Sequence, residues 1–129
     1  MDSDSVRLAT KAECIDVLSR DGVIERISCE AGEIKSGHGY LINDRMLLIL
    51  IDHWPIAEAH IAEPKEHWRH IHTDIDDSLI FIQSLGYNSV YTNVSEKLKT
   101  TLNLLKKHNF KYQKTIDNEV ILKWVSKQH

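Results

Sequence analysis

The hydrophobic period of the chain changes twice between residues 46 and 94, and this change limits the fold more than any other feature of the sequence. Met46–Asp52 is apolar on both faces, which is typical of a strand inside a sheet. Ile56–Ala62 then alternates, with Ile56, Glu58, His60 and Ala62 on one face and Ala57, Ala59 and Ile61 on the other. The two segments predict neighbouring antiparallel strands joined by a turn at His53–Pro55.

An amphipathic helix follows the second of these strands. Its apolar residues recur every three or four positions and are Trp68, Ile71, Ile75, Leu79 and Ile82. Gly86 is expected to end the helix. Two starts remain open: Pro64 suits a first helical turn, whereas Thr73 and Asp76 form a capping box. Ser89–Val94 is a strand that should run parallel to Ile56–Ala62, because a crossover helix connects the two.

The N-terminal part adds a strand, a helix and another strand. Val6–Thr10 predicts a short strand, and Lys11–Ser19 predicts a helix for which Thr10 and Glu13 form a capping box. Tyr40–Ile42 predicts the first strand of a three-stranded antiparallel meander.

The stretch between the first helix and the meander is less regular. Asp21-Gly22 marks a break. Val23–Cys29 is compatible with either a short helix or a strand, and Ala31–Gly39, which contains three glycines, is expected to be a loop.

The C-terminal part predicts a helix and a hairpin. Ser95 is a candidate N-cap, and the apolar positions of the helix are Leu98, Leu102 and Leu105. The helix ends in the basic residues Lys106–His108, with Asn109 as a left-handed stop. Phe110–Lys114 and Val120–Val125 are strands joined around Asp117-Asn118. The element order predicts an α/β (α+β) fold in which residues 1–129 form one domain, with a mixed, mostly antiparallel sheet and helices on both faces.

Composition excludes several classes of protein. The net charge is −3 with His neutral, so the basic excess of a nucleic-acid binder is missing. The longest apolar run, Met46–Ile51, is far shorter than the ~20 residues that a membrane helix needs. The polar start carries no signal-peptide pattern, and a cytoplasmic protein without membrane contact is expected. Cys14 and Cys29 form no CxxC pair, which argues against a zinc knuckle or a disulfide framework.

The order of elements resembles the GNAT N-acetyltransferase superfamily from Val6 to Val125. Several local segments are also similar to that family: Ile56–Ala62 leading into Pro64–Arg69, the helix ending Ser84–Tyr87, the strand Val90–Val94 and the segment Leu104–Phe110. The resemblance implies a V-shaped opening between two central parallel strands, which here are Ile56–Ala62 and Ser89–Val94.

The same resemblance implies that acetyl-CoA is the co-substrate and that no metal is needed. A strand backbone would bind the pantetheine arm, and the following loop and helix start would bind the pyrophosphate. The residues expected to contact the co-substrate are Ile61, Ala62, Trp68, Arg69, His70, Ile71, His72, Thr73 and Asn93. The acceptor would be an amine on a small molecule or a protein. The closing hairpin lies at dimer interfaces in many family members, which implies a homodimer.

Glu58 and His60 share the strand face on which bases commonly lie in that family. His60 as it stands, or Glu58 with a pKa raised by burial, would serve as a base near neutral pH. The alternative is that both are ordinary strand residues without a chemical role.

The chain departs from the family pattern at two places. Arg69–Thr73 contains no glycine where the family's phosphate loop has them, and His72 stands at one of those positions. Asp74, Asp76 and Asp77 follow, and their charges would repel a diphosphate. The helix after Ser95 also lacks the tyrosine that acts as an acid in many family members. These departures support an alternative, namely a catalytically degenerate GNAT-like protein that acts as a binding module.

The polar run from His67 to Asp77 has a third interpretation. Its histidines and aspartates could bind Zn or Ni. We favour a solvated helix face over a metal site there, because Trp68, Ile71 and Ile75 already complete the buried stripe.

Overall fold

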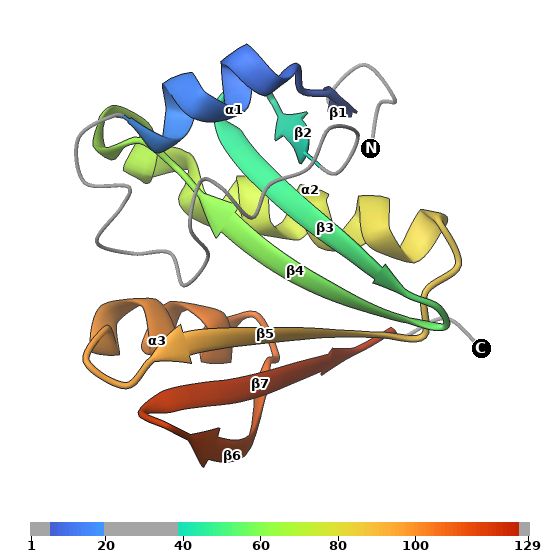
Figure 1. Cartoon of the computed structure of the whole chain (residues 1–129), viewed down its shortest axis with the longest axis vertical. Coiled ribbons are helices and arrows are strands. Elements are labelled where there is room, and N and C mark those ends of the chain that lie inside the picture. The colour runs from blue at the N-terminus through green and yellow to red at the C-terminus, as the bar shows by residue number, and fades with distance from the viewer. Residues whose placement is uncertain (1–5, 20–38, 127–129) are drawn as a thin grey trace.

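The computed structural model describes residues 6–19 and 39–126. The predictions for Asp21-Gly22, for Val23–Cys29 and for positions 31–38 of the expected loop lie outside these ranges. The described residues form one mixed sheet with the strand order β1-β2-β3-β4-β5-β7-β6 (Figure 1). The strands are β1 (Val6–Leu8), β2 (Gly39–Ile42), β3 (Met46–His53), β4 (Ile56–Ala62), β5 (Ser89–Ser95), β6 (Lys111–Ile116) and β7 (Glu119–Val125). The helices are α1 (Lys11–Leu18), the 3-10 helix η4 (Lys65–His70), α2 (Ile71–Ser84) and α3 (Lys99–Lys107).

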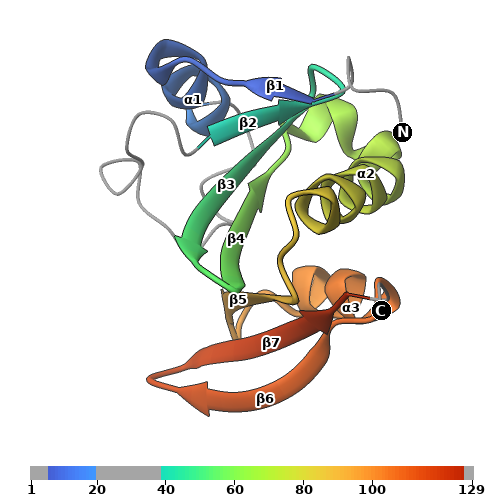
Figure 2. The ribbon, with the colours of Figure 1, turned by 90° about the vertical axis from the view of Figure 1, so that its right-hand side faces the viewer.

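Helices cover both faces of this sheet, as the sequence predicts. Figure 2 shows α1 on one side and α2 and α3 on the other. The two sides have separate apolar clusters, because alternate strand residues point to opposite faces. On the α1 side the cluster contains Cys14, Val17, Leu47, Ile49 and Ala62. On the α2 and α3 side it contains Leu48, Leu50, Ala57, Ile75, Leu79, Ile82, Val90, Leu102 and Leu105, among others.

The two central strands are parallel but pair only at one end. β4 and β5 are in register at Ile56–Ser89, Ala57–Val90 and Glu58–Tyr91, and beyond these three pairs they separate (Figure 1). On its other edge β4 pairs with β3 as far as Ala62, and β5 pairs with β7 along its full length. The opening expected between these strands is therefore present.

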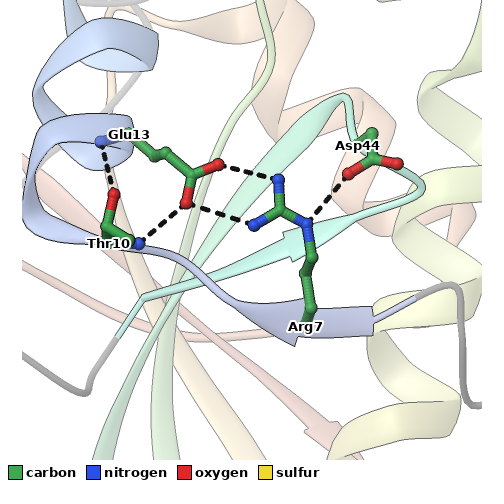
Figure 3. A network of polar contacts seen from close by, with 4 residues as sticks. All are labelled: Arg7, Thr10, Glu13 and Asp44. Carbon is green, nitrogen blue, oxygen red and sulfur yellow. Dashed lines mark hydrogen bonds and ion pairs between the residues drawn. The ribbon is translucent and has the colours of Figure 1, made fainter.

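A polar network fixes the N-terminal elements. Thr10 and Glu13 form the predicted capping box, in which the Thr10 hydroxyl accepts from the Glu13 N–H and Glu13 accepts from the Thr10 N–H. Arg7 donates to both oxygens of Glu13, at 3.1 and 2.7 Å, and to Asp44 at 3.0 Å (Figure 3). The guanidinium of Arg7 and the N-cap hydrogen bond lower the pKa of Glu13 to about 2. The network joins β1, α1 and the β2–β3 turn.

Three predicted boundaries are wrong. The helix after β4 starts neither as an α-helix at Pro64 nor at Thr73, because the 3-10 helix η4 fills the interval and continues into α2. Ser95 does not cap α3, which begins at Lys99 after a turn. Gly39 belongs to β2, since it pairs with Ile49, and so the expected loop ends earlier.

Positive φ angles occur where short turns require them. Asn43 and Asp44 join β2 to β3, and Asp117 and Asn118 join β6 to β7, all with φ between 50° and 68°. Such angles suit Asn and Asp better than other non-glycine residues. Asn109 (φ 71°) follows α3 and Gly86 (φ 94°) follows α2, as predicted from the sequence.

The tight contact between β2 and α1 gives a first prediction. A Cβ atom at Gly39 would lie 2.7 Å from Cys14 Sγ and 3.4 Å from Leu47 Cδ1. Gly39→Ala should therefore lower the free energy of unfolding by about 1–3 kcal/mol, measured by urea denaturation. In a Cys14→Ala background the same change should cost clearly less, and an equal cost in both backgrounds would contradict this explanation.

Candidate functional site

A pocket of about 450 Å³ opens where β4 and β5 separate. The end of β4 forms one wall, the η4–α2 segment forms a second, and α3 forms a third. The lining residues are Ile61, Ala62, Glu63, Trp68, Ile71, His72, Thr100, Thr101, Asn103, Leu104 and Lys107. The pocket thus lies between the continuous segment from the end of β4 to the start of α2 and the more distant helix α3.

A smaller cavity of about 40 Å³ lies deeper between the two strands. His60 and Asn93 line it, together with apolar residues of the sheet and of α2. Ile61 and Thr101 line both spaces, so the two are neighbours. A cavity needs roughly 10–15 Å³ to hold one water molecule. The deeper cavity therefore has room for a group of about three non-hydrogen atoms.

Glu58 and His60 form a hydrogen-bonded pair where the strands part. His60 Nε2 lies 2.6 Å from Glu58 Oε2. The His60 side chain is only 4% exposed, whereas the Glu58 side chain is 35% exposed. His53 Nε2 lies 3.5 Å from the second Glu58 oxygen. Because Glu58 pairs with Ile51 and His60 with Ile49, both side chains share the face covered by α1.

The neighbouring strands add further groups to the same face. Tyr91 lies opposite Glu58 in the register, and Lys123 Nζ lies 5.4 Å from the centre of the Tyr91 ring. Because its side chain is the more exposed of the two, Glu58 is the accessible member of the Glu58–His60 pair, and His60 is the buried one.

The residues predicted to bind the co-substrate divide into three groups. Ile61, Ala62, Trp68, Ile71 and His72 line the larger pocket. Asn93 lines the deeper cavity instead. Arg69, His70 and Thr73 line neither of these two spaces. The predicted co-substrate residues did not include Glu63 or any α3 residue of the pocket; among these, the sequence marks only Lys107, which stands in a basic run.

The start of α2 differs from the expected phosphate loop. η4 continues into α2 without a break, and the Ile71 N–H donates to the carbonyl of Trp68. An open helix end presents free N–H groups to an anion, but here a helical turn precedes that end. The start of α2 therefore offers fewer free N–H groups than an open helix end does.

Two of the three aspartates at the start of α2, Asp74 and Asp77, are bound to the β2–β3 turn, whereas the sequence suggests a repulsive cluster. Asp74 is fully buried and accepts from Arg45 at 2.7 and 3.1 Å and from Asn43 at 2.8 Å. Asp77 also accepts from Asn43, at 2.9 Å. Burial disfavours the charged form of Asp74, but Arg45 and Asn43 outweigh it, so its pKa is lowered. A solvated helix face, which we favoured for this run, is therefore wrong for Asp74.

Glu63 is the unusual group of the pocket. It is 95% buried (5% exposed), and neither of its carboxyl oxygens has a hydrogen-bond partner among the described residues. Burial raises the pKa of Glu63 to about 9, and Asp74 acts in the same direction, because its carboxylate can accept a hydrogen bond from protonated Glu63 and its charge opposes ionisation. The side chain is consequently a neutral acid at pH 7, so it does not oppose an anionic ligand.

The raised pKa of Glu63 predicts how stability depends on pH. In the unfolded chain Glu63 loses its proton near pH 4.5, whereas in the folded protein it keeps the proton to about pH 9. Folding therefore takes up a proton in this window, and the free energy of unfolding should fall as pH rises, by up to about 1.4 kcal/mol per pH unit from this group. Urea denaturation across the window would measure this.

Glu63→Gln should reduce the decrease of the free energy of unfolding with pH, because the amide does not titrate. Glu66→Gln, at an exposed glutamate of η4, is the matched control and should leave it unchanged. An identical slope in the Glu63 variant would show that another group causes the dependence.

Two surveys complete the description of the site. Among residues 6–19 and 39–126, no group of three or more His, Cys, Asp or Glu side chains is placed to hold a metal ion. In the same part of the chain, no helix has the length and apolar character needed to cross a membrane.

Comparison with solved structures relates this architecture to known proteins. The ribosomal-protein-S18-alanine N-acetyltransferase from Escherichia coli superposes with a TM-score of 0.69 at 9% identity, covering 93% of this chain and 92% of that one. A Bacillus subtilis acetyltransferase in complex with CoA gives 0.65 at 18% identity, covering 94% and 97%. An acetyltransferase of the GNAT family from Streptococcus pneumoniae gives 0.62 at 12% identity, covering 93% and 97%.

The chain has the GNAT fold. No family model and no curated protein matches its sequence. Because the identities to the solved structures are low, the likeness concerns the fold alone, and the chemistry must be argued from the residues of this chain.

Proposed function

We propose that the protein is an acetyl-CoA-dependent N-acyltransferase that transfers an acetyl group to an amine. One observation carries the proposal: the Glu58–His60 pair lies at the end of the β4–β5 pairing, and a cavity of about 40 Å³ lies between the same two strands beside the larger pocket. That cavity matches a small acyl group, whereas the larger pocket would take part of an extended carrier.

The residues of the larger pocket suit such a carrier. Ile61, Ala62 and Trp68 would lie along its pantetheine arm, and the neutral Glu63 can both donate a hydrogen bond to an amide and accept one. His72 and Lys107 would face its phosphates. Arg69, His70 and Thr73 lie in or beside the turn that precedes α2 and would act only at the rim.

Glu58 is the proposed base, and His60 holds it in place. The amine nitrogen attacks the thioester carbon, the C–N bond forms, and the C–S bond breaks to release the thiol form of the carrier. The proton lost by the amine goes to Glu58, which is accessible, while the sulfur gains a proton from water or from the site. His60 hydrogen-bonds Glu58 Oε2 and keeps that carboxylate oriented toward the opening.

Acyl transfer to a panel of primary amines (a polyamine, an aminoglycoside and peptides with free amino termini) tests the base. The thiol released from acetyl-CoA is the readout. Glu58→Gln should lower kcat by about a hundredfold to ten-thousandfold, because the amide cannot accept the proton. Glu66→Gln is the control and should retain activity, and full activity in Glu58→Gln would show that Glu58 is not the base.

Calorimetric titration with acetyl-CoA separates this proposal from its alternative. Micromolar binding with a rise in Tm supports the acyltransferase. Absence of binding at millimolar ligand would instead favour a GNAT-like protein that has lost catalysis and serves as a binding module.

A further inference from the structure

A chain of three side chains connects α2 to α3 at the edge of the larger pocket. His108 Nδ1 lies 2.8 Å from Asp76 Oδ1, and His108 Nε2 lies 2.9 Å from His72 Nδ1. The two imidazole rings meet edge to edge, with centroids 5.1 Å apart and planes inclined by 24°. The His108 side chain is 7% exposed and that of Asp76 is 64% exposed, while His72 is exposed and lines the pocket.

The hydrogen bonds of this chain fix where protons can sit. An ionised carboxylate only accepts, so His108 Nδ1 must carry a hydrogen. When both rings are neutral, His72 Nδ1 therefore donates to His108 Nε2, and His72 Nε2 is left as a bare acceptor. An additional proton enters at His72 Nε2, and both hydrogen bonds persist whether the positive charge rests on His72 or on His108. A second additional proton would set two N–H groups against each other.

The charges around His72 favour taking up the first additional proton when an anion binds. Asp76 from α2 compensates a positive charge on the His72–His108 pair. Lys107 from α3 lines the same pocket as His72 and opposes that charge, but it also attracts the same anion. Glu63 at the end of β4 is neutral below about pH 9. Arg69 and His70 precede His72 in the sequence, and partial burial lowers the pKa of His70.

We propose that Asp76, His108 and His72 form a phosphate-binding element beside this pocket, which only His72 lines, and that a bound diphosphate brings one proton into the three side chains. The inference rests on the proposed function, because it assigns a CoA-type ligand to the pocket. It explains how a segment without glycines, and without an open helix end, can hold an anion. The uncharged chain presents a lone pair at His72 Nε2, and the protonated chain presents an N–H donor and a positive charge.

Dephospho-CoA is the probe that tests this, because its diphosphate is esterified at both ends and does not titrate near neutral pH. Calorimetric titrations at about pH 7, in buffers of different ionisation enthalpy, count the protons taken up on binding. We expect uptake approaching one proton. The association constant should fall as pH rises, because each bound diphosphate requires the added proton.

Three variants assign the proton. His72→Gln should bind more weakly and take up no proton, and Asp76→Asn should shift the uptake to lower pH, since it removes the compensating charge. Both positions are exposed, so both variants are expected to fold. His67→Gln changes another histidine of the same region, on η4 beside Glu66, and should keep the uptake of the original protein.

The outcomes separate the two proposals. Binding without proton uptake, or uptake that survives in His72→Gln, overturns the role of the histidine chain and leaves the proposed acyltransferase intact. Absence of dephospho-CoA binding at every pH overturns the histidine chain. If acetyl-CoA also fails to bind, the proposed function falls with it.

Discussion

The short pairing between β4 and β5 is the constraint on which the rest of the structure depends. After Glu58–Tyr91 the two strands separate, although each remains paired on its other edge. Backbone N–H and C=O groups along the facing edges then need other partners, which water or a ligand with amide groups can supply. The opening also determines which side chains lie around it. Glu58 and His60 of β4 lie on the face of the sheet covered by α1, and side chains of α2 and α3 lie on the opposite face.

Charge is arranged around this opening so that an anionic ligand is tolerated. Asp74 is buried but paired with Arg45 and Asn43, and Glu63 beside it keeps its proton at pH 7. Breaking a buried ion pair leaves an uncompensated charge, so Arg45 and Asp74 also fix the β2–β3 turn to the start of α2. The acidic start of α2 thus contributes to packing, and in the proposed complex His72 and Lys107 would contact the anion.

The histidine chain and the missing glycines belong to the same physical problem. A glycine loop holds phosphates with backbone N–H groups because no Cβ hinders close approach. In this chain η4 occupies that place, and its turn hydrogen bonds continue into α2. A side-chain donor that gains its hydrogen from solution is one way to replace a backbone donor, but it makes binding depend on pH.

The sequence predicted most strands and helices and the shared face of Glu58 and His60, because these follow from local period: alternation places both residues on one face of β4. It also determined the parallel direction of β5, since a crossover helix leaves little choice. It did not predict the partners of Asp74 or the contact of His72 with His108. These join residues about 30 to 36 positions apart, and only the packing of α2 and α3 against the sheet brings them together. Charges that look crowded along the sequence are therefore paired in space, and that pairing was decided by the tertiary structure.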